Sequence, residues 1–462
     1  MSATAFRQYD VRGVVGRDLD EEFYHRLGLA LGTRMARAGS RTVVVGRDAR
    51  ESSPAFTECL RKGLLETGRR VIDLGLITTP MTIFGLNFLQ AEASVAVTAS
   101  HNPAEYNGAK IRHGGSDGVA PVYGEQLQDL RALFESGDFE KGEGRLDKIS
   151  IDDAYRTAIV GRVTPSRAMK VVVDAGNGSG GLVAPDILDQ LGFDVVPLFC
   201  EVDGSFPNHH PDPTKLKNLQ DLAEKIRDEG ADCGVALDGD ADRMVLVDET
   251  GGVHWPDRIL MALTKAELPR LGGGLVVCDV KCSQGVAEVA ESVGGRAVMT
   301  KTGYPFLLEA MADPDAVFGI ELSGHQYFGR DRLFDFDDGV HSAARTLEVF
   351  SRDSRPVSAQ MADLPSYVAT PEIRATCPEE RKFAVTDELV AAFRDDSELV
   401  SLLDTDGARA TYPEGWGLVR ASNTEPSLVM VFESKTEDGL AKLKSRFAEK
   451  VSAFPEIEVD LS

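Results

Sequence analysis

Three aspartates at every second position form the sharpest chemical pattern in this sequence. Asp238, Asp240 and Asp242 lie in the stretch DGDADR, which follows the apolar run CGVAL and precedes MVLVDE. In an extended segment or a tight loop, alternate side chains turn to one side, so three carboxylates can meet. Such a group suits a hard cation such as Mg²⁺ and leaves positions open for a phosphate oxygen. A solvated acidic turn is the simpler alternative.

A calcium-binding EF-hand is a second reading of the same stretch. Asp238, Asp240, Asp242 and Glu249 occupy positions one, three, five and twelve of such a loop. Position six, which needs glycine, is Arg243, and both flanks read as strands instead of helices. The sequence therefore excludes an EF-hand.

Ser100 is a candidate nucleophile. It lies in TASHNP (98–103), after the apolar run SVAV (94–97), which predicts a short buried strand. Pro103 cannot continue a strand or a helix, so the serine falls on a turn at the end of a strand. Open α/β sheets carry their chemistry at this edge. Shortly afterwards, YNGAKI (106–111) places Lys110 where it could fold back over the serine loop. An ordinary polar turn is the alternative.

Two later stretches combine polar groups that suit a sugar phosphate. GIELSGH (319–325) places a carboxylate, a hydroxyl and an imidazole at alternating positions, which are Glu321, Ser323 and His325. These groups can hold sugar hydroxyls. RASNTEPS (420–427) surrounds one guanidinium with short polar side chains, which are Arg420, Ser422, Asn423 and Thr424. A fork-shaped guanidinium beside short donors can cradle a phosphate. A capped turn is the alternative for the second stretch.

The composition limits the class of partner. The chain has 462 residues and a net charge of −24, which argues against nucleic acids and anionic membranes. An anionic substrate would need arginine and lysine gathered inside the motifs, as they are here. No run is long enough to span a membrane and the N-terminus lacks a signal pattern, so we expect a cytoplasmic protein. Six scattered cysteines show no disulfide framework and no zinc spacing.

Strand and helix patterns alternate along most of the chain. VVVGRDAR (43–50), VVVDAGNG (171–178) and VVCDVKCS (276–283) are comparable openings of a strand, a turn and a helix. The glycines at 176, 178, 180 and 181 do not form a dinucleotide-binding fingerprint. From about residue 365, strand-like runs precede a helix expected at 438–454. The fold class predicted is α/β, with three related α/β domains and a smaller C-terminal α+β domain.

The ordered motifs resemble the α-D-phosphohexomutases, most closely their bacterial phosphomannomutase/phosphoglucomutase branch. The resemblance covers essentially the whole chain. It rests on YDVRG (9–13), TASHNP, DGDADR, DVKC (279–282), GIELSGH and YPEGWGLVRASNTEPSL (412–428). It implies mixed sheets and a heart-shaped molecule around a central cleft. The implied domains are 1–148 (phosphoserine), 149–252 (metal), 253–364 (sugar) and 365–462 (phosphate).

The resemblance also implies a role for each candidate residue. Ser100 would be the phosphoserine and would bind Mg²⁺ together with the three aspartates. Arg12 and Lys110 would serve proton transfer. Glu321 and Ser323 would bind the sugar, with His325 beside them, and RASNT (420–424) would bind the remote phosphate. The residues that would line the cleft are Tyr9, Arg243 and Lys281.

The implied reaction interconverts hexose 1-phosphate and hexose 6-phosphate, with mannose or glucose as the sugar. It passes through a hexose 1,6-bisphosphate, and glucose or mannose 1,6-bisphosphate would act as activator. The protein would be a monomer that binds small hexose phosphates. An amino-sugar phosphate mutase, a metal-dependent sugar phosphatase and a non-catalytic sugar-phosphate-binding protein are the alternatives. Leu322 favours the mannose/glucose branch, and the remote phosphate motif argues against simple hydrolysis.

Two residues depart from the family pattern. Ala241 stands where glycine is common, which a negative φ would tolerate. Tyr304 follows KTG, where a histidine that touches the ligand phosphate is frequent in the close branch. A phenol carries no positive charge near neutral pH. We therefore expect substrate affinity or preference to depend on Tyr304.

Overall fold

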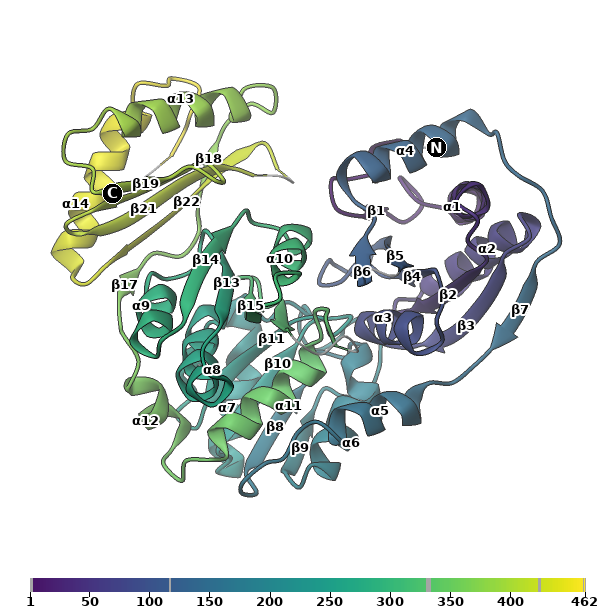
Figure 1. Ribbon diagram of the computed structural model, residues 1–462, viewed down its shortest axis with the longest axis horizontal. Helices are drawn as coiled ribbons and strands as arrows, with labels where there is room; N and C mark the ends of the chain where they lie inside the picture. Colours follow the sequence, from purple (N-terminus) through teal and green to yellow (C-terminus); the bar gives the residue numbers. More distant parts are fainter. Residues whose placement is uncertain (1–2, 116–117, 330–333, 423–424, 460, 462) are drawn as a thin grey trace.

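The computed structural model describes residues 3–115, 118–329, 334–422, 425–459 and 461. These residues form four sheets with helices packed on them (Figure 1). The strands of the first sheet are β1 (Val11–Val14), β2 (Thr42–Arg47), β3 (Arg70–Leu76), β4 (Ala93–Val97), β5 (Tyr106–Gly115), β6 (Gly118–Pro121) and β7 (Arg145–Lys148). Those of the second are β8 (Lys170–Asp174), β9 (Asp194–Leu198), β10 (Cys233–Leu237), β11 (Met244–Asp248) and β12 (Val253–His254). Those of the third are β13 (Leu275–Asp279), β14 (Arg296–Thr300), β15 (Ala316–Ile320) and β16 (Gln326–Phe328).

The first three sheets share one topology. In each, the first strand of the repeat lies in the middle, the second and third strands flank it in parallel, and a fourth strand pairs antiparallel with the third. The matching strand orders are β3-β2-β4-β5, β9-β8-β10-β11 and β14-β13-β15-β16. The prediction of three related α/β domains with mixed sheets is therefore confirmed.

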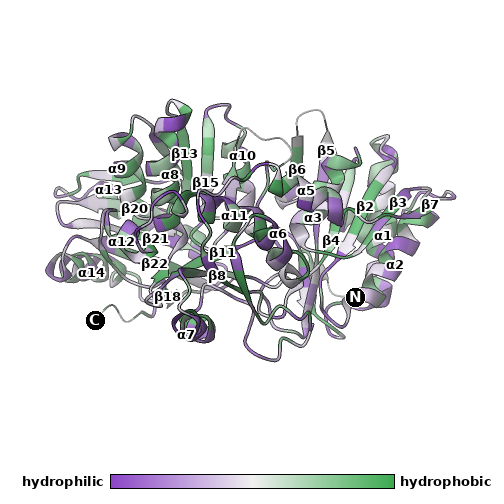
Figure 2. Ribbon diagram, turned by 90° about the horizontal axis from the view of Figure 1, so that it is seen from below, coloured by the Kyte–Doolittle hydropathy of each residue, from purple (hydrophilic) through white to green (hydrophobic). Residues whose placement is uncertain are grey.

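Helices connect the parallel strands and cover the sheets. They are α1 (Glu21–Arg37), α2 (Ser53–Glu66), α3 (Thr79–Phe88), α4 (Gly124–Ser136), α5 (Asp152–Val160), α6 (Ala184–Gln190), α7 (Gln220–Glu229), α8 (Pro256–Leu271), α9 (Gly285–Ser292), α10 (Tyr304–Met311), α11 (Gly339–Phe350) and α12 (Val357–Ala362). The central strands β4, β10 and β15 are buried along their whole length, as expected for parallel strands covered on both faces. Hydrophobic residues follow the strands, whereas the outward helix α7 is largely hydrophilic (Figure 2).

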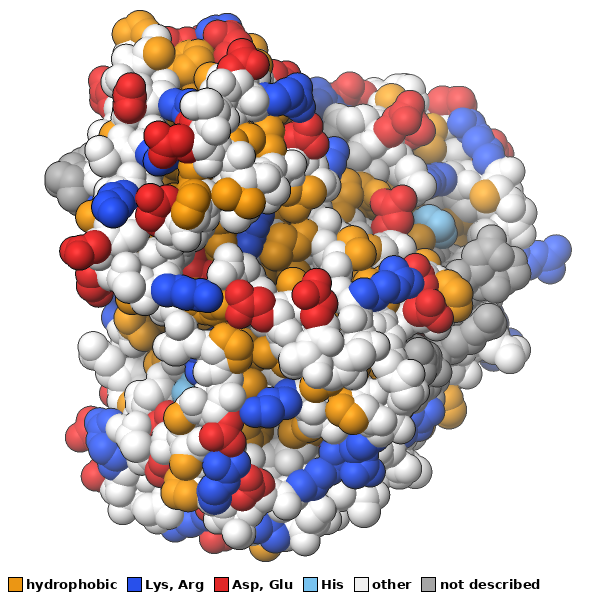
Figure 3. Space-filling model, turned by 60° about the vertical axis from the view of Figure 1, so that its left-hand side comes forward, with side chains coloured by type: hydrophobic (Ala, Val, Ile, Leu, Met, Phe, Trp, Pro, Cys, Tyr) orange, Lys and Arg blue, Asp and Glu red, His pale blue; other side chains and the backbone are white. Residues whose placement is uncertain are grey.

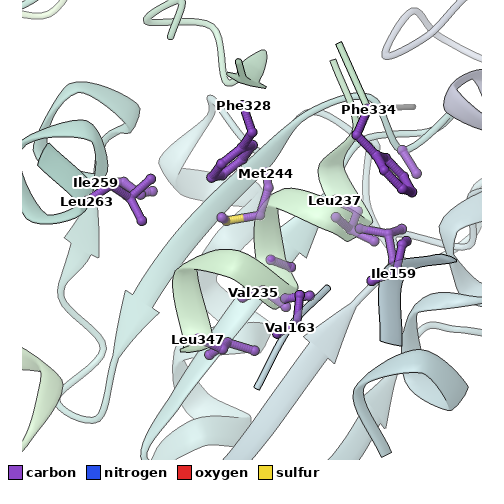
Figure 4. Packing of buried hydrophobic residues seen from close by; sticks show 14 of the residues in the cluster. Ile159, Val163, Val235, Leu237, Met244, Ile259, Leu263, Phe328, Phe334 and Leu347 are labelled. Atoms are coloured by element: carbon purple, nitrogen blue, oxygen red, sulfur yellow. The ribbon is translucent and has the colours of Figure 1, made fainter. Parts of the chain in front are cut away.

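One apolar core runs through the first three domains. It extends in sequence from Val44 to Leu364 and includes residues of all three sheets and of the helices between them. Figure 4 shows part of it, where side chains of β10 and β11 pack against α8 and α11; labelled examples are Val235, Leu237, Met244, Ile259 and Leu347. Because the second and third domains share this core, the loops at the ends of their sheets are held in a fixed relation.

The fourth domain is an antiparallel sheet with its own core. Its strands are β17 (Val368–Ala369), β18 (Ile373–Thr376), β19 (Ser401–Leu403), β20 (Ala408–Tyr412), β21 (Gly415–Ala421) and β22 (Ser427–Ser434). The order is β17-β22-β21-β20-β19, with β18 also paired to β22. Helices α13 (Lys382–Arg394) and α14 (Glu437–Val451) pack on it. The C-terminal helix ends at Val451, so the predicted end at residue 454 is wrong. The α+β prediction for this domain is confirmed.

The charged side chains and the cysteines are distributed over several domains. Acidic and basic side chains alternate over the face in Figure 3, with no large area of one sign. All six cysteines are free thiols, and Cys233, Cys278, Cys282 and Cys377 are buried. Among the residues described, no helix is both long enough and apolar enough to cross a membrane.

Candidate active site

The chemistry-bearing loops occupy the same place in each of the first three domains. Each joins the third parallel strand to its antiparallel neighbour: residues 98–105 between β4 and β5, 238–243 between β10 and β11, and 321–325 between β15 and β16. The first carries Ser100, the second the three aspartates and the third Glu321. The EF-hand is excluded as predicted, since the strands β10 and β11 flank the aspartates.

Direct contacts bring these three loops together. The Ser100 hydroxyl donates to Asp238 Oδ2 at 2.9 Å, which joins the first loop to the second. Arg243 and His325 form a β-bridge, which joins the second loop to the third. Arg243 Nε also donates to His325 Nε2 at 3.0 Å. The second loop therefore lies between the other two.

Ser100 is held in an unusual backbone conformation. Its φ is +51°, in the left-handed region that residues other than glycine seldom adopt. The residue is 1% exposed, and its N–H donates to Thr98 Oγ1 at 2.9 Å. The hydroxyl also lies 3.1 Å from His101 Nδ1. Strained backbone of this kind is common where a side chain must point in one direction for function.

Lys110 supplies positive charge beside the aspartates. Strand β5 runs antiparallel to β4 and places Lys110 opposite Ala96, close to the serine loop as predicted. Its Nζ donates to Asp240 Oδ2 at 2.8 Å and also contacts Asp242. Burial lowers the pKa of Lys110, but the carboxylates of Asp240 and Asp242 outweigh burial and raise the pKa above its ordinary value. Lys110 is therefore an ammonium at neutral pH.

The aspartate group can hold a metal ion. Asp238, Asp240 and Asp242 are fully buried, and each offers an oxygen within 4.8 Å of the others. Asp240 Oδ1 and Asp242 Oδ1 have no hydrogen-bond partner among the described residues. Burial and the two neighbouring carboxylates raise the pKa of Asp238. Buried carboxylates that repel one another and keep unpaired oxygens are suited to a divalent cation.

Ala241 does not have the negative φ on which its tolerance was expected to rest. Its φ is +60°, and the residue is fully buried. The tight turn between Asp238 and Met244, in which Ala241 N donates to Asp238 O, requires this left-handed residue. Glycine adopts such a φ without steric cost, which accounts for a preference for glycine here.

The third loop is a compact turn. Glu321 N donates to His325 O at 2.9 Å, and Gly324 N donates to Glu321 O at 2.9 Å. The ring of His325 lies between Arg243 and Asp337, with Nδ1 at 2.8 Å from Asp337 Oδ2. Asp337 in turn accepts from Arg112 at 3.0 Å. Ser323 Oγ is buried and has no hydrogen-bond partner among the described residues.

The fourth domain contributes a buried guanidinium. Arg420 is 4% exposed, and its Nε donates to Asp406 Oδ2 at 2.7 Å. Its Nη2 is buried without a partner among the described residues. Ser422 Oγ accepts from Glu425 N at 3.2 Å. The predicted ligands Asn423 and Thr424 lie outside the described residues. A buried N–H that lacks an acceptor fits an anionic ligand such as phosphate.

Of the remaining predicted residues, Arg12 is held within the first domain, whereas Tyr9 and Tyr304 link the first domain to the third. Arg12, on β1 beside β5, donates to Asn102 Oδ1 at 2.6 Å and also binds Asp10. Tyr9 Oη donates to Thr302 O at 3.2 Å, and Tyr304 Oη donates to Tyr9 O at 3.0 Å. Both bonds join the first domain to the third.

Lys281 joins the third domain to the segment that enters the fourth. Its Nζ donates to Glu372 Oε1 at 2.8 Å and lies 3.7 Å from Asp279 Oδ2. Burial lowers the pKa of Lys281, but Asp279 and Glu372 outweigh burial and raise it. Lys281 is therefore also a cation at neutral pH.

Sequence patterns missed several supporting residues. Asp337 and Asp406, which hold His325 and Arg420, stand in no motif that was singled out. Thr79 Oγ1 donates to Asp240 Oδ2 at 2.6 Å from the start of α3. Such residues could only be found once the fold placed them next to the motifs.

Comparisons with known proteins match the whole architecture. Residues 3–141, 153–252 and 255–367 match the phosphoglucomutase/phosphomannomutase alpha/beta/alpha domains I, II and III. Residues 372–450 match the C-terminal domain of the same family.

Individual relatives agree with the family match. The chain is 42% identical over 453 residues to a phosphomannomutase/phosphoglucomutase of Pseudomonas aeruginosa, covering 98% of this chain and 96% of the relative. It is 38% identical over 454 residues to a phosphoglucomutase of Neisseria gonorrhoeae, covering 98% and 97%. A crystal structure of a phosphoglucomutase/phosphomannomutase family protein from Burkholderia thailandensis superposes with a TM-score of 0.91 at 35% identity, covering 99% of both chains. The chain belongs to the phosphoglucomutase/phosphomannomutase family.

Proposed function

We propose that the protein interconverts hexose 1-phosphates and hexose 6-phosphates, with mannose or glucose as the sugar. The observation that carries the proposal is the contact of Ser100 Oγ with Asp238 at 2.9 Å. It places a hydroxyl that can carry a phosphoryl group beside buried carboxylates and an ammonium. The names of the relatives support the substrate class.

Phosphoryl transfer needs positioning and charge neutralisation more than covalent chemistry from the protein. In the first half-reaction, the bond between phosphorus and Ser100 Oγ breaks, and a bond to a free sugar hydroxyl forms. Lys110 donates a proton to the departing Oγ, and the proton released by the sugar hydroxyl restores the ammonium. The product of this step is a hexose 1,6-bisphosphate.

In the second half-reaction, the bisphosphate presents its other phosphate to Ser100. The serine hydroxyl attacks that phosphorus and gives its proton to the sugar oxygen that leaves, through the same lysine. We infer that Arg12, which donates to Asn102 of the serine loop, assists this proton transfer. The enzyme is phosphorylated again, and the isomeric hexose monophosphate is released.

Mg²⁺ is the metal that we propose for the aspartate group. Asp238, Asp240 and Asp242 would hold it together with a phosphoserine oxygen, and the unpartnered oxygens of Asp240 and Asp242 fit this role. When bound, the ion would neutralise charge on the phosphoryl oxygens. Glucose 1,6-bisphosphate or mannose 1,6-bisphosphate would act as activator by phosphorylating Ser100.

The remaining groups fit a substrate that carries one phosphate away from the reacting centre. We infer that Arg420, with RASNT (420–424), holds this phosphate, since its Nη2 is buried and unpartnered among the described residues. Glu321, Ser323 and His325 would hold the sugar hydroxyls, while Tyr9, Arg243, Lys281 and Tyr304 would line the site. A phosphatase has no need of a second phosphate site. This proposed site at RASNT (420–424), the phosphate clamp, therefore argues for a mutase.

We also propose the domain boundaries 1–148, 149–252, 253–364 and 365–462. The first and third boundaries fall between sheets, whereas the boundary at 252 comes just before β12, which pairs with β11 of the second sheet. We infer that the protein works as a monomer, because the loops of one chain supply every group that the reaction needs.

A coupled assay tests the function. Mannose 1-phosphate, glucose 1-phosphate and glucosamine 1-phosphate are compared with Mg²⁺ and a trace of glucose 1,6-bisphosphate. We expect turnover of the first two substrates and little of the third. Ser100→Ala should abolish turnover and still bind substrate. Release of free phosphate without isomerisation would mean that the protein is a phosphatase and not a mutase. Turnover of glucosamine 1-phosphate alone would mean that the substrate is an amino-sugar phosphate.

A further inference from the structure

A fully buried arginine lies beneath the serine loop. Arg50 follows β2 and is 0% exposed. Its Nη2 donates to Ser100 O at 2.9 Å and to Asn102 O at 2.6 Å. Its Nη1 donates to Pro103 O at 2.5 Å and to Tyr106 O at 3.1 Å. Three carbonyl oxygens of the serine loop and one at the start of β5 therefore converge on one guanidinium.

Arg50 forms an ion pair with Asp48. Arg50 Nε donates to Asp48 Oδ2 at 3.0 Å, and Asp48 is 3% exposed. Asp48 Oδ1 accepts from Arg50 N and from Ser53 Oγ, which fixes the carboxylate. A guanidinium has five N–H donors in a rigid plane, and all five are used here. A lysine could not replace this pattern, because its three donors sit on one atom.

Arg50 binds the backbone of Ser100, which has an unfavourable conformation. Ser100 has a φ of +51°, which is unfavourable for serine. Its carbonyl lies between Arg50 and Gly239 of the aspartate loop, where an added Cβ would come within 2.6 Å of Ser100 O. The Ser100 peptide is thus restrained from two sides, and its hydroxyl is directed at Asp238.

A loop of the second domain closes over Arg50. The ring of Phe206 lies 5.2 Å from the guanidinium carbon. A Cβ on Gly204 would come within 2.2 Å of Ala49 O, so the two backbones are in close contact. This cover excludes water, and hydrogen bonds between a buried guanidinium and carbonyls are stronger without competing water.

We propose that Arg50 is a positioning residue for phosphoryl transfer. It holds the Ser100 backbone in the conformation that aims Oγ at the aspartate group, and it does so without touching substrate. The proposal rests on the phosphoserine function proposed above. Because a misplacement of about 1 Å can cost about 100-fold in rate, the restraint should act on the chemical step and not on substrate affinity.

The test compares Arg50→Lys with wild type as full-length proteins. Three quantities are measured: kcat and KM for glucose 1-phosphate, and the rate at which glucose 1,6-bisphosphate phosphorylates Ser100, followed by intact mass. We expect kcat and the phosphorylation rate to fall about 100-fold, while KM stays within about two-fold. Arg26→Lys is the matched control, since Arg26 also donates to main-chain carbonyls of the first domain, those of Phe134 and Glu135. The control should keep wild-type kinetics.

Wild-type kcat and phosphorylation rate in folded Arg50→Lys would overturn the proposal, and so would an equal loss in the Arg26 control. If Arg50→Lys does not fold, Phe206→Leu takes its place, because it keeps the arginine and removes only the ring. A fall in kcat of about five-fold at unchanged KM supports the proposal, and unchanged kcat overturns it. If wild type is phosphorylated on Ser100 but does not interconvert hexose phosphates, the proposed function is wrong. The comparison of phosphorylation rates between wild type and Arg50→Lys then still tests the role of Arg50.

Discussion

One oxygen of Asp406 binds both Thr302 and Arg420. Oδ2 accepts from Thr302 N at 2.9 Å and from Arg420 Nε at 2.7 Å. Since Tyr9 also donates to Thr302 O, a continuous path of hydrogen bonds runs from the first domain through the third to the fourth. The aspartate that orients Arg420 is therefore itself held by Thr302 of the third domain.

Asp406→Asn should weaken this orientation. The variant loses the ion pair with Arg420, and charge-assisted hydrogen bonds of this kind contribute about 1.5–3 kcal/mol. We expect KM for hexose phosphates to rise about ten-fold, with a smaller change in kcat. The control is Asp404→Asn, which removes an exposed ion pair with Arg394 at 2.6 Å. A lower KM in Asp406→Asn would mean that Asp406 only neutralises the charge of Arg420 and does not orient it.

Removal of the metal should abolish turnover and lower stability. Treatment with a chelator is expected to stop interconversion, and Mg²⁺ should restore it. Because a ligand that binds only the folded state stabilises it, saturating Mg²⁺ should also raise Tm by several degrees. Asp240→Asn should lose most of this Tm shift. The exposed control Asp228→Asn should keep it. An unchanged shift in Asp240→Asn would place the ion elsewhere.

Ala241→Gly should be far less destabilising than an equivalent change in a strand. Glycine relieves the left-handed φ of +60°, worth about 1–2 kcal/mol, and this offsets the lost methyl burial of about 1 kcal/mol. Ala236 is a buried alanine of β10 that lacks a positive φ. We expect Ala236→Gly to lower Tm clearly and Ala241→Gly to change it little. Equal losses would show that the φ of Ala241 is not a source of strain.

Tyr304→His should alter substrate kinetics. The phenol is buried and uncharged, since burial raises its pKa above the ordinary value. A histidine there could carry positive charge toward the ligand phosphate. We expect a several-fold change in kcat/KM for at least one hexose phosphate. Tyr304→Phe, which removes only the hydrogen bond to Tyr9 O, separates this effect from the loss of the domain contact. Untouched kinetics in the histidine variant would mean that residue 304 does not contact ligand.

Stability should depend on pH through Asp338. This residue caps α11, accepts from Tyr155 Oη at 2.8 Å, and burial raises its pKa to about 7. The folded carboxyl therefore keeps a proton that an unfolded aspartate has already released above about pH 4. The stability from this group is full at lower pH and is lost progressively as pH rises to about 7. Asp338→Asn cannot titrate, so its Tm relative to wild type should rise between about pH 4.5 and about pH 7.5. If the Tm values of wild type and Asp338→Asn changed in parallel with pH, Asp338 would not be the group responsible.

The strands and motifs were predictable because they are local. The run CGVAL became β10 residue for residue, and Lys110 returned beside the serine loop because β5 pairs antiparallel with β4. Asp238, Asp240 and Asp242 met on one side of a tight turn, as their spacing indicated. Alternating apolar runs and turn residues encode these features within a few positions.

The residues that support the site were not predictable in this way. Asp406 and Arg420 are 14 positions apart, and Asp337 reaches Arg112 across 225 positions. The sign of φ at Ala241 was also missed, because it depends on how the turn packs against its neighbours. Contacts of this kind depend on the assembled fold, and no local sequence pattern predicts them.

The repeated strand order bears on the origin of the molecule. Three sheets that place their reactive loops after the third strand are what successive duplications of one ancestral unit would leave. In each sheet the loop after the third strand carries a different group: Ser100, the aspartates or Glu321. Because each sheet contributes one group from the same connection, the reactive groups lie far apart in the sequence and yet meet at one place.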